Sequence, residues 1–248
     1  MPYSNSIDGS NLLGIKLNYT RPNGESSTMD SFLKLNRDLL EECRSSPLQL
    51  KKSCPETKAK LQSQGKEDSQ GTGNKVTDQE AAFASCLESK GFVFLPKQKK
   101  GQHLVTLPKD GVYYIYQANG SQQSVDFQTL LIEKSQVTKE VSYDLKHTTS
   151  KSFYLNDGWF HDNIIYVVTW SPKKDSVQTF IGLGQNIPTD EERAHMAEMI
   201  KFKQTTNEKN KKVGSLRPYV RFANQYSCES FTDTLSRSHF EKTNTFLG

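Results

Sequence analysis

The stretch that decides the fold is HLVTLPKDGVYYIYQ, residues 103 to 117. Apolar residues precede a Pro-Lys-Asp-Gly turn at 108 to 111, and a run of β-branched and aromatic residues follows it. Such residues suit the pleated surface of a sheet, and this turn chemistry is typical of a chain reversal. The stretch therefore predicts one strand that enters a tight turn and a second strand that leaves it.

Further runs of strand character lie on both sides of this stretch. A short one is predicted at Phe92 to Leu95, and longer ones at 124 to 133, 141 to 145 and 152 to 185, with a loop at 135 to 139. Seven or eight short strands at this spacing suit two facing antiparallel sheets. We therefore predict a mainly β fold, an antiparallel two-sheet β-sandwich of the jelly-roll type with peripheral helices.

Four motifs occur in a defined order: HLVTLPKDGVYYIYQ, then FQTLLIEKS, then SFYLNDG with DNIIYVVTW, and last VQTFIGLG. In this order they resemble the tumour necrosis factor homology domain, over residues 103 to 185. The resemblance implies a TNF-like jelly roll that assembles as a homotrimer. It also implies a cytokine that engages a cell-surface receptor of the TNF-receptor type at the clefts between subunits.

The resemblance gives individual residues expected roles. On a strand, Tyr114 and Tyr116 point to the same side. In a trimer of this kind that side would pack aromatic rings around the threefold axis, together with Phe180 from the closing strand. Receptor contacts would come from two loops, with the candidates Ser135, Gln136, Lys139, Trp159, Phe160 and His161.

Composition limits the class of protein. The chain has 248 residues, 34% of them hydrophobic, and a mean hydropathy of −0.70, although its centre is plainly apolar. We divide it into a polar N-terminal segment (1–76), the TNF-like domain (77–187, with a further early strand from 11–20) and a helical and polar extension (188–248). The net charge of +4 is scattered along the chain, so we expect no nucleic-acid partner.

Helical patterns lie in the flanks. Ser27 to Arg44 is amphipathic and is expected to pack on the domain. Thr77 with Glu80, and Thr189 with Glu192, are capping boxes, so we predict a short helix to Ser89 and a longer one from about Asp190 to about Lys203.

Other flanking residues have simpler interpretations. Met196 and Met199, in the second of these helices, are interpreted as packing residues. Ser45 to Lys75 is predicted to be a linker and Ser227 to Gly248 a mobile end, because both are poor in apolar residues.

Compartment and cysteine chemistry stay open at this point. No run approaches the roughly 20 apolar residues of a membrane helix, and no signal peptide is visible. The resemblance implies an extracellular protein, secreted or shed, and a cytoplasmic protein is the alternative. Cys43, Cys54, Cys86 and Cys228 permit up to two bridges, and their pairing is undetermined; free thiols or one local bridge such as Cys43 to Cys54 are the expectation.

The motifs of enzymes are not found. None of the five histidines stands in a nucleophile frame, and no nucleotide-binding loop or zinc-ligand spacing occurs. We therefore expect no enzymatic activity, no cofactor, no metal and no small-molecule substrate. The main alternative to the cytokine is an intracellular or viral jelly-roll module for protein interaction or self-assembly. A carbohydrate-binding module, which would expose Trp159 or Trp170, comes next, and a hydrolase comes last.

Overall fold

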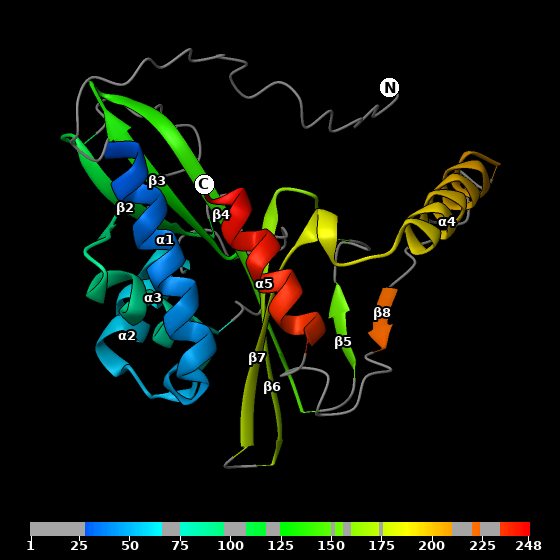
Figure 1. Cartoon of the computed structure of the whole chain (residues 1–248), viewed down its shortest axis with the longest axis horizontal. Coiled ribbons are helices and arrows are strands. Elements are labelled where there is room, and N and C mark those ends of the chain that lie inside the picture. Colours follow the sequence, from blue (N-terminus) through cyan, green and yellow to red (C-terminus); the bar gives the residue numbers. More distant parts are fainter. Residues whose placement is uncertain are drawn as a thin grey trace.

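The computed structural model describes residues 28–65, 75–96, 108–117, 125–149, 152–155, 160–173, 176–209, 220–223 and 234–248 (Figure 1). The helices in it are α1 (Thr28–Ser45), η1 (Pro47–Lys51), α2 (Pro55–Gly65), α3 (Asp78–Ser89), η2 (Gly184–Asn186), α4 (Asp190–Lys209) and α5 (Thr234–Phe246). The strands are β1 (Val93–Phe94), β2 (Gly111–Tyr116), β3 (Phe127–Glu133), β4 (Gln136–Thr148), β5 (Ser152–Leu155), β6 (Ile164–Lys173), β7 (Ser176–Leu183) and β8 (Val220–Ala223). The strands expected at 11–20 and at 103–107 lie outside the described residues.

Six strands form one open sheet in the order β1-β2-β3-β4-β6-β7. Strands β2, β3 and β4 are an antiparallel meander, and β6 and β7 are a hairpin. The turn between β3 and β4 consists of Lys134 and Ser135, whose φ angles of 52° and 59° match the left-handed turn that suits a twisted hairpin. Strand β4 therefore begins at Gln136, and the loop predicted at 135 to 139 is wrong beyond its first residue.

The two antiparallel groups meet in a parallel pair. Strand β4 pairs with β6 from Ser142↔Ile164 to Thr148↔Trp170, and β1 also runs parallel to β2. Between β4 and β6 the chain crosses over and supplies β5, which pairs with β8 in a separate two-stranded sheet.

The sandwich prediction needs correction. Strands and surrounding helices are present, but the residues that the structure describes form one open mixed sheet of six strands and a separate pair of strands, where two facing antiparallel sheets were predicted. The physical reason is the crossover, which brings β6 beside β4 in the same direction. The continuous apolar run from Ile164 to Trp170 indicates a strand buried on both faces, but it does not show which strand lies beside it or in which direction.

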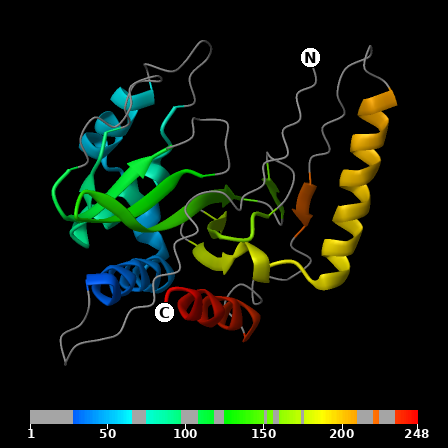
Figure 2. The same cartoon turned by 90° about the horizontal axis from the view of Figure 1, so that it is seen from above.

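One face of the sheet is covered by helices. Figure 2 shows α1 and α5 lying together under the sheet, and α3 packs on the same core. The two helices are tied by Arg37, whose Nη1 donates to the carbonyl oxygens of Leu247 at 3.1 Å and Gly248 at 2.7 Å. Helix α5 also lies against β7, the last strand of the sheet, so it shields an edge that would otherwise expose unpaired backbone groups.

The opposite face carries a smaller apolar cluster on β6 and β7. It consists of Val125, Phe160, Ile164, Tyr166, Val168, Trp170 and Ile187, with Phe180 packed against it. Trp170 is buried, which agrees with its interpretation as a core residue and disfavours its use in sugar binding. Trp159 lies outside the described residues.

The segments predicted to be a linker and a mobile end contain helices. Helix α2 and η1 lie within 45 to 75, where Leu50 and Leu61 are buried in the main core. Helix α5 lies within 227 to 248 and buries Phe240, and Leu247 is buried directly after the helix ends. These predictions were wrong because a few apolar residues at helical spacing suffice when a sheet is present to receive them.

Candidate functional site

Helix α4 begins at a capping box, as predicted. The amide of Thr189 donates to Oε2 of Glu192 at 2.7 Å, and the amide of Glu192 donates to Oγ1 of Thr189 at 3.2 Å. Asp190 and Glu191 add negative charge to the first turn, where it interacts favourably with the helix dipole. The helix runs to Lys209, beyond its predicted end at about Lys203.

The first turns of α4 are fastened to the body of the protein. Nη1 of Arg193 lies 3.6 Å from Oδ1 of Asp162, and Nη2 donates to the carbonyl oxygen of Pro188 at 3.5 Å. Met196 is buried, which confirms its interpretation as a packing residue. Beyond this point α4 extends away from the sheet, as Figures 1 and 2 both show.

The projecting part of α4 exposes three large apolar side chains, of which Met199 and Phe202, three residues apart, lie side by side on the helix surface. Met199 is 48% exposed, Ile200 41% and Phe202 69%, and we call these three residues the α4 patch. Elsewhere among the residues that the structure describes, large apolar side chains are exposed only singly, at Leu48 and Val93. Single exposed apolar residues are ordinary, whereas a cluster indicates a contact surface. Met199 was predicted to pack against the domain, and this is wrong.

The charge of α4 changes sign along its length. The first ten residues carry Asp190, Glu191, Glu192 and Glu198 against Arg193, which gives four minus one, a net charge of −3. The last ten carry Lys201, Lys203 and Lys209 against Glu208, which gives three minus one, a net charge of +2. The α4 patch lies where the acidic half meets the basic half.

The two tyrosines predicted at the subunit contact lie inside their own chain. Tyr114 and Tyr116 are buried, and their hydroxyls donate to Glu88 and Glu80 of α3, the second at 2.8 Å. Burial, followed by the neighbouring carboxylates, raises the pKa of both phenols. Helix α3 thus occupies the side of β2 that was predicted to face another subunit.

Phe180 is half-buried on β7, and its ring lies 5.4 Å from the ring of His239 on α5. The helix therefore covers part of the surface predicted for a neighbouring subunit. The structure does not bring Phe180 together with the two tyrosines, because β7 and β2 are separated by three strands of the sheet.

The predicted receptor contacts divide into exposed and packed residues. Ser135, Gln136 and His161 are exposed. Lys139 is half-buried with its Nζ 6.0 Å from the ring centroid of Phe246, and Phe160 is buried edge-on against Tyr166 at 5.0 Å. Lys139 and Phe160, two of the five described candidates, thus make contacts within their own chain.

In the described part of the chain, two carboxyl groups are buried, Glu80 on α3 and Asp144 on β4. Oδ1 of Asp144 accepts from Nζ of Lys146 at 2.6 Å, and its Oδ2 is buried without a hydrogen-bond partner. Burial raises the pKa of Asp144, and the nearby Asp126 raises it further against the opposing effect of Lys146. Burial also raises the pKa of Glu80. These groups hold elements together, as when Oδ2 of Asp126 accepts from the amide of Leu145 at 2.8 Å.

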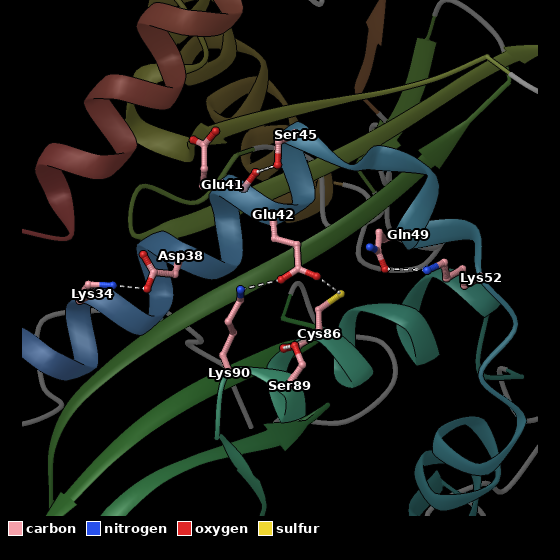
Figure 3. Close-up of polar contacts among 10 residues, drawn as sticks. All are labelled: Lys34, Asp38, Glu41, Glu42, Ser45, Gln49, Lys52, Cys86, Ser89 and Lys90. Atoms are coloured by element: carbon pink, nitrogen blue, oxygen red, sulfur yellow. Dashed lines mark hydrogen bonds and ion pairs between the residues drawn. The ribbon is translucent and has the colours of Figure 1, made fainter.

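A second polar group joins α1 to α3. Figure 3 shows Glu42 between Lys90 and Cys86: its Oε2 lies 2.7 Å from Nζ of Lys90, and Sγ of Cys86 approaches its Oε1 at 3.9 Å. Cys43, Cys54 and Cys86 are free thiols, as expected. Burial raises the pKa of Cys86 to about 11 and that of Cys43 well above its ordinary value, so both are protonated at neutral pH.

Within the described ranges, no group of three or more His, Cys, Asp and Glu side chains is placed to hold a metal ion. None of the described helices combines the length and the apolar character needed to cross a bilayer.

Comparison with known proteins gave no match: no family model fits the chain, and neither a curated protein nor a solved structure is significantly similar to it.

Proposed function

We propose that this protein is a non-enzymatic protein-interaction module that self-assembles through helix α4. The single observation that carries the proposal is the α4 patch, three exposed apolar side chains, two of them adjacent on the helix surface, on a helix that projects from the body. Apolar side chains gathered in this way lower the free energy when another protein surface removes them from water.

The construction of α4 supports this role. Its first turn is closed by the capping box, and Arg193 and the buried Met196 connect the helix to the body of the protein. Phe and Met are among the side chains enriched at the centres of protein interfaces. A rigid helix that offers such residues loses little conformational entropy on binding.

The test is the mass of the full chain in solution as a function of protein concentration, by sedimentation velocity and light scattering. One chain has a mass of 28.1 kDa, and self-assembly through α4 predicts that the weight-average mass rises toward a multiple of this value. In the variant M199A/F202A we expect the dissociation constant to rise about tenfold or more, because truncation of central apolar residues typically costs over 1 kcal/mol each. Alanine preserves the helix.

The matched control is L48A/V93A, which removes two large apolar side chains that are equally exposed but lie outside α4. This control should assemble like the wild type. A wild-type protein that remains at 28.1 kDa at every concentration would refute the proposal, and so would a control variant as impaired as the α4 variant.

The TNF-like receptor-binding ligand is the second candidate. The order of its motifs supports it, and so does the exposure of Ser135, Gln136 and His161. It requires a TNF-like sandwich and an aromatic surface for trimer formation, and the open sheet and the burial of Tyr114 and Tyr116 give it less support. The same experiment separates the two, because a trimer unaffected by M199A/F202A would favour the receptor ligand.

A further inference from the structure

We infer that the partner of α4 is α4 of a second copy, packed antiparallel so that Met199 of each helix lies against Phe202 of the other. This inference rests on the proposed function and names the partner and the geometry of the contact. Its evidence is the placement of the α4 patch along the helix and the division of charge on either side of it.

The patch lies at the centre of the helix. Met199 and Phe202 are three residues apart, so they point to neighbouring positions about 60° apart around the helix axis. The midpoint between them falls close to the middle of Asp190–Lys209. When two such helices pair antiparallel about that midpoint, each Met199 meets a Phe202 and the two helices overlap over most of their length.

The charges favour the antiparallel order. About the same midpoint, the acidic first half of one helix, with net charge −3, lies beside the basic second half of the other, with net charge +2. A parallel pair would place acidic half beside acidic half and basic half beside basic half. Like charges at a contact oppose association and opposite charges favour it, so the antiparallel order is the one that α4 permits.

Other partners fit less well. A nucleic acid or an anionic membrane surface would attract the basic half and repel the acidic half, and a uniformly basic partner would do the reverse. A second copy of α4 satisfies both halves at once. The antiparallel contact also has twofold symmetry, so it closes with two copies and predicts a dimer.

Charge reversal in α4 tests the inference. Variant E191K/E198K changes the first half from −3 to +1, and variant K201E/K203E changes the second half from +2 to −2. Both leave the capping box and the α4 patch in place. In each of these variants both halves of α4 have a net charge of the same sign. We therefore expect the dissociation constant of the homodimer to rise about tenfold at low salt.

The combined variants give the decisive result. A chain that carries all four substitutions has complementary halves again and should regain dimerisation, although each pair of substitutions alone weakens it. An equimolar mixture of the two single-half variants should form heterodimers more tightly than either forms homodimers. These effects should shrink at high salt, because the charges are exposed and screened.

The controls separate this inference from the proposed function. Circular dichroism checks that each variant keeps its helix, and E56K/E140K makes the same change in net charge as E191K/E198K at exposed positions outside α4. If the wild type dimerises and the reversal variants dimerise with unchanged affinity, the antiparallel contact is refuted while self-assembly stands. If the chain with four substitutions dimerises no more tightly than the chains with two substitutions, the antiparallel contact is likewise refuted. If the wild type is a monomer, the proposed function itself fails.

Discussion

Tyr116 on β2 donates its hydroxyl hydrogen to Oε1 of Glu80 on α3 over 2.8 Å, and Oε2 of the same carboxylate accepts from the amide of Thr77 that caps α3. One buried side chain thus closes the first turn of the helix and fixes that helix to the sheet. The bond explains why the aromatic side of β2 is unavailable to another subunit.

The substitution Y116F should destabilise the protein. It removes a donor from a buried carboxylate, and we expect the free energy of unfolding to fall by about 1 to 3 kcal/mol. Y113F is the matched control, because the hydroxyl of Tyr113 donates to the carbonyl oxygen of Lys109 at an exposed position and its loss should cost much less. Urea denaturation measures both, and equal costs would contradict the importance of the Glu80 contact.

Local features of the sequence predicted much of the fold. The capping boxes at Thr77 and Thr189 and the strand segments at β2, β6 and β7 are confirmed, because each depends on neighbouring residues alone. The side of β2 occupied by α3 could not be predicted, since a tyrosine ring is equally suited to a core and to an interface.

Long-range features of the fold were missed. The parallel pairing of β4 with β6 joins residues 22 positions apart (164 minus 142), and the apolar pattern of a strand does not identify its partner. Of the candidate site, Phe202 gave a signal that was overlooked: an aromatic residue between Lys201 and Lys203 on a charged helix has little to pack against.

Asn36 of α1 should prove essential to stability. It is fully buried, its Nδ2 donates to the carbonyl oxygen of Phe32, and its Oδ1 accepts from the hydroxyls of Thr129 and Tyr143. N36A leaves both hydroxyls without this acceptor in the core, at an expected cost of about 2 to 4 kcal/mol. A double-mutant cycle with Y143F should show coupling above about 0.5 kcal/mol, whereas additive losses would contradict the shared contact.

Asp144 should make the protein less stable as the pH rises through the acid range. This is the opposite of what a carboxylate in a favourable ion pair does. Its pKa is raised in the folded protein by burial, so between its ordinary pKa and the raised pKa the folded state holds a proton that the unfolded state has lost. The free energy of unfolding must then fall as pH rises through that window, by about 1.4 kcal/mol for each unit between the two pKa values.

The substitution D144N removes this titration. The difference in unfolding free energy between D144N and the wild type should move in favour of D144N as pH rises from about 4, and then level off above the raised pKa. E140Q is the control at an exposed position on the same strand. A pH-independent difference between D144N and the wild type would contradict the raised pKa.

Alkylation should rank the described thiols by burial and charge. Cys54 is half-buried and should react with iodoacetamide before Cys86 and Cys43, whose pKa values are raised mainly by burial. Glu42 raises the pKa of Cys86 as well, so E42Q should accelerate alkylation at Cys86 several-fold. Peptide mapping by mass spectrometry gives the rate at each site, and an unchanged rate at Cys86 in E42Q would refute the contact shown in Figure 3.

The parallel junction between β4 and β6 divides the sheet into a meander and a hairpin, each able to form from neighbouring residues. Across it, Gln79 reaches from α3 to the carbonyl oxygen of Lys146 on β4 and to Oγ1 of Thr169 on β6. Native proteins open in cooperative units. Amide hydrogens that bond β4 to β6 should therefore exchange with deuterium sooner than those within the meander or the hairpin. Q79A should increase this difference in exchange rate.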